Sequence, residues 1–240
     1  CLAPVTLTFG YPSGGTYSGN PYIAGNVFTP PSAGTYTITY TYTSGCSTTN
    51  ITKDLIIEGT PSAPTAPDKE YCVGSIAYLN TTSGVNVRWY EGGTFVSNAN
   101  PFSTGKTAAG IYNYTVTQTV DGCESAATPV KLTIYSSTSI TSQPSSASKC
   151  VGQDVSFAVS ATGPNLSYQW RKGAVNLVDG GTISGAKTPN MSITNVQLTD
   201  AGNYTCVVSS SCGPITSNVA VLTVDIQHQV FQAIMQYVLF

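Results

Sequence analysis

Apolar and polar residues alternate along most of the chain, and this pattern indicates strands with one buried face. Four runs show it most clearly: residues 36–42, 112–117, 130–134 and 219–224. Short glycine-containing turns separate the runs, as at residues 121–122, and such turns connect antiparallel strands. No segment between residues 1 and 224 has a sustained helical period. The pattern therefore predicts an all-β chain of antiparallel β-sandwiches.

The chain repeats itself. Three segments begin with a cysteine followed by an alternating strand, and we call Cys1, Cys72 and Cys150 the opening cysteines. Three segments also end with a Gly-x-Tyr strand that leads to a second cysteine. These closing cysteines are Cys46, Cys123 and Cys212. Because the spacing between closing and next opening cysteine is nearly constant, the sequence predicts three tandem domains.

The predicted domains are a sandwich at residues 1–58, a second at 69–135 and a third at 136–224. The first begins at its opening cysteine and so leaves no room for a first strand. Residues 59–68 contain three prolines and predict a semi-rigid linker. Residues 225–240 contain no Ser, Thr, Gly or Pro and form an atypical tail.

Aromatic residues identify the type of sandwich. In the third repeat Trp170 has the position of a core tryptophan, and Asp200-Ala-Gly202-Asn-Tyr204 matches the tyrosine corner of immunoglobulin domains. The second repeat keeps a tryptophan and a Gly-x-Tyr but lacks the aspartate. The first keeps only the Gly-x-Tyr and the cysteines. The predicted core signature is Trp89, Tyr112, Trp170, Asp200 and Tyr204.

Composition excludes several functions. Charged residues are 8% of the chain and the net charge is −2, which argues against a polybasic nucleic-acid binder. The single histidine excludes most His-based catalytic and metal sites. The carboxylates are scattered singly, so neither a calcium loop nor a catalytic acid pair is evident. We therefore predict no enzyme activity, no catalytic residue, no cofactor and no metal. No apolar run is long enough for a transmembrane segment.

Cysteine usage indicates the compartment. Seven cysteines in a chain rich in Ser and Thr and poor in charge are typical of a secreted protein. The predicted location is extracellular or at the cell surface.

These residues resemble the immunoglobulin-like and PKD-like repeats of large secreted surface proteins of the Bacteroidota, of the adhesin type. The segments that carry the resemblance are Gly34-Thr-Tyr36, Tyr71-Cys72-Val-Gly74 with Trp89, and the immunoglobulin repeat that begins at Cys150. It covers roughly residues 1–224. The resemblance implies export by the type IX secretion system and roles in adhesion, in gliding or as spacers in secreted enzymes.

The repeats also suggest how the cysteines pair. If each opening cysteine bonds to its own closing cysteine, the disulfides are Cys1–Cys46, Cys72–Cys123 and Cys150–Cys212. Chain entropy gives such bonds roughly 4 kcal/mol each. The seventh cysteine, Cys206, is then left as a free thiol. No activating group is evident beside it, so we expect a cysteine buried in the core and not a nucleophile. A rival scheme pairs Cys150 with Cys206 and leaves Cys212 free.

The tail has a different pattern. Apolar residues recur every four positions, which is compatible with an amphipathic helix. Its stripe consists of Ile226, Val230, Ile234 and Val238. Because a completed sandwich could not bury this stripe, we expect it to bind a partner. A strand of an unrelated domain, or a segment of uncertain sequence, would be the alternatives.

The leading hypothesis is a non-catalytic surface or secreted repeat protein, a stalk or adhesin segment of a longer chain. Its expected partners are neighbouring domains of that chain, with surface glycans or other proteins as further candidates, and no nucleic acid. The alternative is an accessory region of a secreted hydrolase, in which tyrosine stripes such as Tyr36, Tyr40 and Tyr42 would stack on sugar rings.

Overall fold

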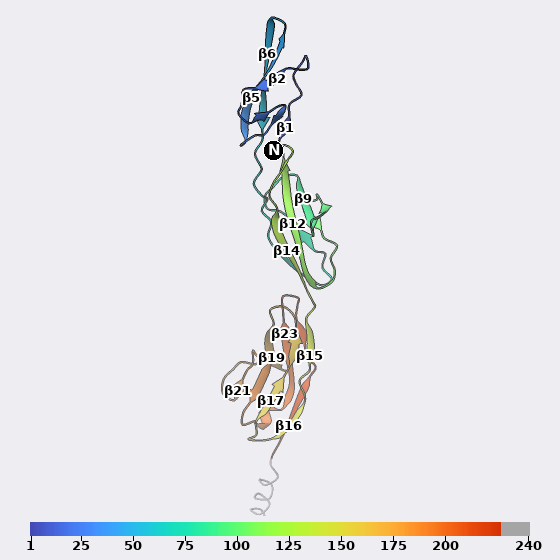
Figure 1. The fold of residues 1–240 in the computed structure, drawn as a ribbon. Helices are drawn as coiled ribbons and strands as arrows, with labels where there is room; N and C mark the ends of the chain where they lie inside the picture. Colours follow the sequence, from blue (N-terminus) through green and yellow to red (C-terminus); the bar gives the residue numbers. More distant parts are fainter. Residues whose placement is uncertain (227–240) are drawn as a thin grey trace, which may run out of the picture. The chain divides into compact units, whose positions relative to one another are not determined.

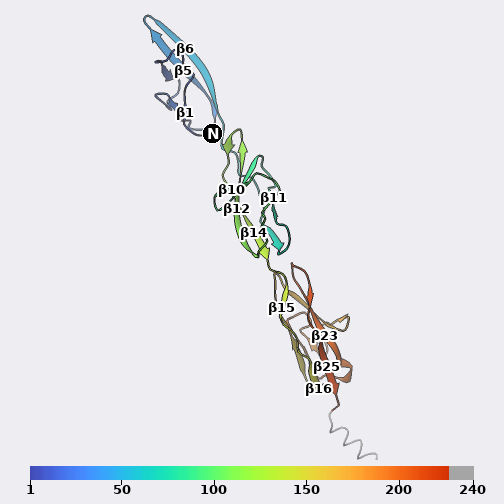
Figure 2. The ribbon, with the colours of Figure 1, turned by 90° about the vertical axis from the view of Figure 1, so that its right-hand side faces the viewer.

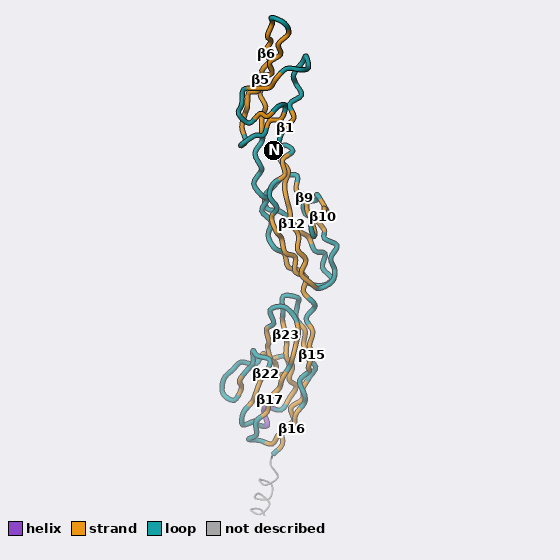
Figure 3. The backbone as a smooth tube through the Cα atoms, in the orientation of Figure 1, coloured by secondary structure: helices purple, strands orange, loops and turns teal. Residues whose placement is uncertain are grey.

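The computed structural model describes residues 1–226, and the regular elements of these residues are β-strands and one short 3-10 turn, joined by loops (Figures 1 and 3). These residues fall into two compact units. One contains Cys1–Lys69, Ala77–Gly105 and Tyr112–Leu132, and the other contains Glu70–Ile76, Lys106–Ile111 and the described chain from Thr133 onward. The strands group into the three predicted repeats: the first (1–58), the second (69–135) and the third (136–224). That three-domain division stays a prediction.

The first repeat has two three-stranded sheets, ordered β1-β4-β3 and β2-β5-β6. β5 and β6 pair antiparallel along their whole length, from Gly34↔Ile57 to Ser44↔Ser47. Alternating Thr and Tyr favour this long hairpin because branched and aromatic side chains suit a half-buried sheet face. The strands are β1 (Val5–Thr6), β2 (Thr16–Ser18), β3 (Ile23–Ala24), β4 (Val27–Phe28), β5 (Gly34–Ser44) and β6 (Ser47–Ile57).

The second repeat contains a larger sheet, ordered β10-β9-β12-β14-β7, with β13 paired to β12. A two-stranded sheet of β11 and β8 accompanies it. The strands are β7 (Lys69–Cys72), β8 (Tyr78–Leu79), β9 (Val87–Glu91), β10 (Thr94–Ser97), β11 (Phe102–Ser103), β12 (Gly110–Val120), β13 (Cys123–Glu124) and β14 (Thr128–Tyr135).

The third repeat has three sheets, ordered β16-β25-β23-β19-β20 with β24 on β23, β17-β22-β21, and β15-β18. β16 runs parallel to β25, whereas β25 runs antiparallel to β23. A short 3-10 turn, η1 (Leu198–Asp200), precedes β23. The strands are β15 (Ser139–Ser142), β16 (Ala147–Cys150), β17 (Val155–Ala158), β18 (Ser160–Thr162), β19 (Ser167–Lys172), β20 (Val175–Asn176), β21 (Ile183–Ser184), β22 (Asn190–Ile193), β23 (Gly202–Ser209), β24 (Ile215–Thr216) and β25 (Ala220–Asp225).

The predicted linker at residues 59–68 does not run free of the second repeat. The Gln118 side chain donates a hydrogen bond to the Ser62 carbonyl at 2.6 Å. Pro64 is buried, and its carbonyl accepts a hydrogen bond from Thr128. Proline cannot donate to a sheet ladder but its carbonyl can accept, so a proline-rich segment can still be fixed along a sheet edge.

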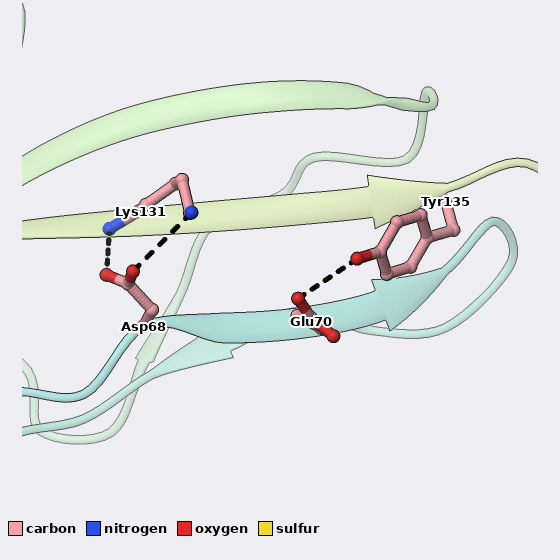
Figure 4. Close-up of polar contacts among 4 residues, drawn as sticks. All are labelled: Asp68, Glu70, Lys131 and Tyr135. Carbon is pink, nitrogen blue, oxygen red and sulfur yellow. Dashed lines mark hydrogen bonds and ion pairs between the residues drawn. The ribbon is translucent and has the colours of Figure 1, made fainter. Parts of the chain in front are cut away.

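Polar side chains continue this attachment along β7 and β14 (Figure 4). The Lys131 backbone N–H donates to Asp68 Oδ1 at 2.7 Å, and Lys131 Nζ lies 3.8 Å from Asp68 Oδ2. Farther along, the Tyr135 hydroxyl donates to Glu70 Oε1 at 3.0 Å, and this contact raises the pKa of Tyr135. Because these side chains are largely exposed, each contact contributes little stability. The pairing of β7 with β14, continued by the Val73 N–H that donates to the Tyr135 carbonyl at 2.9 Å, places Cys72 at the end of β14.

Candidate functional site

The core of the third repeat is built around Trp170 and Tyr204. Trp170, on β19, is fully buried, and its indole N–H donates to the Thr188 carbonyl at 2.9 Å. Tyr204, on β23, stacks on Phe157 with ring centroids 5.0 Å apart. Its hydroxyl donates to the Asp200 carbonyl at 2.7 Å, which is the tyrosine corner. Burial, followed by the charge of Asp200, raises the pKa of Tyr204 to about 12.

Asp200 has a separate structural role at this corner. Its carboxylate accepts a hydrogen bond from the Gln197 backbone N–H at 2.7 Å. That bond caps the η1 turn from which β23 begins. The Asp200 side chain therefore fixes the turn, and the Asp200 backbone carbonyl fixes the Tyr204 hydroxyl.

The first repeat contains the same corner. The Tyr36 hydroxyl donates to the Ser32 carbonyl at 2.9 Å, again four residues earlier in the chain. Both tyrosines follow a glycine by two residues, and Gly34 and Gly202 have φ values of +150° and +151°. Such a φ strongly favours glycine, so the Gly-x-Tyr sequence specifies the local backbone as well as the ring.

The second repeat differs at its tyrosine. Trp89, on β9, is fully buried and donates its indole N–H to the Ala99 carbonyl at 3.1 Å. Tyr112 is only partly buried, and the fully buried ring belongs to Tyr114, two residues later on the same face of β12. The predicted core position of Tyr112 is therefore corrected to Tyr114. The sheet register explains this, because Val116 lies opposite Trp89, as Cys206 lies opposite Trp170, and Tyr114 and Tyr204 each precede that residue by two.

Cys206 is a free thiol inside the third core. It is fully buried in the middle of β23. Burial raises its pKa to about 11, so the reactive thiolate is scarce at neutral pH. Val159, also buried, belongs to the same core cluster. The geometry supports packing rather than nucleophilic chemistry.

The disulfides differ from the predicted ones. The structure bonds Cys1 to Cys123 and Cys72 to Cys212. Both cysteines of each bond lie within one compact unit. Cys46 and Cys150 are free, as is Cys206. The predicted pairs Cys1–Cys46, Cys72–Cys123 and Cys150–Cys212 are therefore wrong, and the rival pair Cys150–Cys206 is not formed either.

Strand direction explains why a repeat cannot bond its own cysteines. In the third repeat Cys150 ends β16, which runs parallel to β25, and β25 runs antiparallel to β23. Cys212 follows the end of β23 and so lies at the opposite end of the sheet. In the second repeat the N–H after Cys72 bonds the Tyr135 carbonyl at the end of β14, whereas Cys123 precedes the start of β14. A disulfide needs Cα atoms less than about 7 Å apart, and eight strand residues span roughly 25 Å.

In the first repeat, too, the opening and closing cysteines lie too far apart for a disulfide. Cys46 lies in the turn of the β5–β6 hairpin, next to the final pair Ser44↔Ser47. The chain's N-terminus lies toward the other end of this hairpin in both views (Figures 1 and 2). Eleven paired residues span roughly 35 Å, so Cys1 cannot reach Cys46.

The tail lies almost wholly outside the described residues. Ile226 is described and is exposed, without helical structure. Val230, Ile234 and Val238 are outside the described part of the chain, so the predicted helix and its partner stay a prediction.

Two surface grooves bear on the sugar-binding alternative. One, of about 360 Å³, is lined by Asp68, Asn113, Tyr114, Pro129, Val130 and Lys131, and its single aromatic ring is buried. The other, of about 440 Å³, is lined by Ala147, Lys149, Asp154, Val155, Ser156, Ser192 and Thr194 and has no aromatic ring. Neither groove offers an exposed ring for stacking on a sugar.

The tyrosine stripe of β5 also points to packing. Tyr40 is buried, and its hydroxyl accepts a hydrogen bond from the Gly15 N–H at 2.7 Å. Tyr36 is committed to its corner, and Tyr42 is half-buried. In residues 1–226 no group of three or more His, Cys, Asp or Glu side chains could hold a metal ion. No helix in that range has the length and apolar character needed to cross a membrane.

Two family models match parts of the chain. Residues 139–210 match the immunoglobulin domain family, and residues 61–135 match the family described as Ig-like domain, CHU_C associated. Together with the all-β structure, these matches confirm the predicted fold class of tandem immunoglobulin-like sandwiches. The second match begins inside the predicted linker, in agreement with the contacts of Ser62 and Pro64. No curated protein matches the chain.

Solved structures of other tandem immunoglobulin domains are similar to this chain at low identity. Extracellular domains 3–5 of Drosophila OTK share 18% identity over 80% of this chain and 71% of that chain, with a TM-score of 0.49. Immunoglobulin domains 1–4 of Sidekick-1 share 17% identity over 93% and 71%, with a TM-score of 0.49. An I-band fragment of titin shares 17% identity over 92% and 87%, with a TM-score of 0.47.

Proposed function

We propose that this chain is a non-catalytic, disulfide-linked stalk or adhesin segment of a secreted or cell-surface protein. The observation that carries the proposal is the pair of disulfides, each of which joins the opening cysteine of one repeat to the closing cysteine of the next. Disulfides form and persist mainly in oxidising compartments. The buried Cys206 and the sparse carboxylates supply no catalytic group.

The finer assignment is a repeat region of a large surface protein of the Bacteroidota, exported by type IX secretion. Its support is the resemblance of the repeats and the match of residues 61–135 to the CHU_C-associated family. A role as a carbohydrate-binding part of a secreted hydrolase finds no support in the two grooves. Binding on a glycan array that is lost when an exposed aromatic residue such as Tyr11 or Phe95 is replaced would revive it.

The disulfide pattern suits a stalk because the two bonds overlap along the chain. When an unfolded, oxidised chain is pulled, the shortest covalent path from Cys1 to Cys212 limits its length. This path crosses the first disulfide to Cys123, follows the backbone back to Cys72 and crosses the second disulfide to Cys212. Only 51 residues lie on that path. The maximum extension between Cys1 and Cys212 is therefore about 180 Å, against about 740 Å for the reduced chain.

Single-molecule pulling tests this proposal directly. The oxidised chain is expected to stop extending at about a quarter of the length reached after reduction. A double variant, Cys1→Ser with Cys72→Ser, should extend fully without reductant. If the oxidised wild-type chain extends as far as the reduced one, the bonds do not limit extension and the stalk proposal fails.

A further inference from the structure

The two disulfides follow one rule. Cys1 opens the first repeat and bonds Cys123, which closes the second. Cys72 opens the second repeat and bonds Cys212, which closes the third. Each bond therefore connects an opening cysteine with the closing cysteine of the following repeat. Under this rule Cys46 would bond the opening cysteine of a preceding repeat, and Cys150 would bond the closing cysteine of a following repeat.

Cys150 occupies the same local structure as the bonded Cys72. Each is followed by Val-Gly, and Gly74 and Gly152 both have a φ of +90°. The two turns have the same hydrogen bond. The Ser75 N–H donates to the Cys72 carbonyl at 3.0 Å, and the Gln153 N–H donates to the Cys150 carbonyl at 3.1 Å. Both cysteines are partly exposed.

The attachment of these turns to their sheets is the same as well. The Val73 N–H bonds the Tyr135 carbonyl at the end of β14, at 2.9 Å. The Val151 N–H bonds the Asp225 carbonyl at the end of β25, also at 2.9 Å. One turn carries a disulfide and its counterpart carries a free thiol, so the local structure of Cys150 is already that of a bonded half-cystine.

Cys46 shares one local feature with Cys123, the bonded closing cysteine of the second repeat: both follow a glycine of positive φ at a hairpin turn. It lies directly after Gly45, which has a φ of +60°, in the turn between two paired strands. Cys123 lies directly after Gly122, which has a φ of +79°, but it is the first residue of β13, where it pairs with Val120 and is buried. Cys46 is exposed, so its thiol is accessible to another chain segment.

We propose that Cys46 and Cys150 are intermolecular or inter-repeat half-cystines, which continue the same linkage to further repeats of this kind. Cys150 bonds a closing cysteine of the type of Cys46, and Cys46 bonds an opening cysteine of the type of Cys150. A second copy of this chain, joined head to tail, supplies both. The inference rests on the proposed function, because it needs an oxidising compartment.

The chemistry is thiol–disulfide exchange. The two thiols lose two protons and two electrons and form one S–S bond, while a protein or small-molecule disulfide accepts the electrons and is reduced to two thiols. Cys206 takes no part, because it is buried and its raised pKa leaves little thiolate.

Two single variants test the proposal. The full chain with Cys46→Ser retains only Cys150 as an accessible free thiol, and the chain with Cys150→Ser retains only Cys46. In a glutathione redox buffer, the mixture is expected to form a disulfide-linked dimer, and peptide mapping should show Cys150 bonded to Cys46. Each variant alone should stay monomeric, because two opening or two closing cysteines do not match.

A random pairing of the three possible dimers would overturn the proposal, as would mixed disulfides with glutathione alone. A chain with two copies joined end to end identifies the source of the partner. An internal Cys150–Cys46 bond in a monomer indicates successive repeats of one polypeptide, whereas bonding only between molecules indicates separate chains. If pulling shows the two internal disulfides but the variants do not pair, the stalk function stands and only this inference fails.

Discussion

The first and third repeats contain the same tyrosine corner in different surroundings. Tyr36 and Tyr204 each donate to a carbonyl four residues earlier, and each follows a glycine with φ near +150°. Tyr204, however, belongs to a cluster of thirteen buried residues, whereas the cluster of the first repeat contains four. The comparison shows that a short motif can specify a turn while core size, set by the rest of the sequence, determines how much stability surrounds it.

Removal of one large core side chain should have the largest effect and should separate the two repeats. Trp170→Ala and Phe28→Ala each delete a fully buried ring and should lower the free energy of unfolding by about 3–5 kcal/mol. The third repeat has many other buried residues and is expected to remain folded, whereas the first repeat should unfold. Hydrogen exchange measured by peptide in the full chain would show this. Equal protection of both repeats in their variants would contradict the role given to core size.

Alanine at the two corner glycines should have the next largest effect. Both positions have a φ that L-residues rarely adopt, so each substitution should cost about 1–3 kcal/mol. The two costs should be similar, because the new Cβ at Gly202 would lie 2.9 Å from Lys172 Cε, the far end of a flexible side chain that can shift, and at Gly34 the nearest atom is in the Tyr36 ring at 3.9 Å. Chemical denaturation gives both values.

Gly59→Ala is the matched control for this pair, because its added Cβ would make only an ordinary contact, 3.5 Å from the Ala33 Cβ. Its effect should be near zero. A loss at Gly59 as large as at the corners would mean that backbone strain is not the cause.

The corners and the sheets follow directly from residue patterns, but the disulfides do not. Alternation specifies strands, and Asp200-Ala-Gly202-Asn-Tyr204 specifies a corner, because both are properties of neighbouring residues. Disulfide pairing depends on which end of a sheet each cysteine occupies. A usable signal would have been strand direction. Cys150 ends β16, whereas Cys212 follows β23, which runs in the opposite direction. Repeat spacing alone does not report the direction of a strand.

Tyr112 illustrates a similar limit on a smaller scale. Aligning Gly110-x-Tyr112 with Gly202-x-Tyr204 places the motif correctly along the chain, but the core position depends on the register with the tryptophan strand. That alignment would place Tyr114 at the position of Cys206, opposite the tryptophan. In the structure Val116 lies opposite Trp89 instead, so Tyr114 corresponds to Tyr204. Tyr114 then becomes the buried ring, and burial, followed by the charge of Glu91, raises its pKa to about 12.

Removal of the corner hydroxyls should give a smaller difference. Tyr204→Phe should lower the free energy of unfolding by about 0.5–1.5 kcal/mol, because a part-buried hydrogen bond is lost at the edge of the core. Tyr36→Phe should cost less, because water reaches the carbonyl of exposed Ser32. Denaturant titration of the full chain, with hydrogen exchange to assign each transition, measures both. A larger loss at Tyr36 would mean that burial does not determine the strength of the corner.

Alkaline pH gives an independent readout of the same corner. The folded state raises the pKa of Tyr204 from 10.0 to about 12, so it disfavours the ionised ring. The stabilisation is present below pH 10 and is lost as the pH rises through 12. Tyr204→Phe should therefore make the third repeat less sensitive to pH across this window. An unchanged pH dependence would show that Tyr204 does not ionise on unfolding.

The smallest effect is expected at Cys206, because the second repeat has a valine at the equivalent position. Val116 and Cys206 both lie opposite a fully buried tryptophan, so the second repeat shows that valine fits beside such a ring. Cys206→Val should therefore change the free energy of unfolding by less than about 1.5 kcal/mol. Cys206→Ser places a hydroxyl in the same apolar site and should cost more, about 1–3 kcal/mol. Equal losses in the two variants would mean that the thiol makes an interaction that packing does not describe, and the register equivalence of Val116 and Cys206 would no longer predict the core.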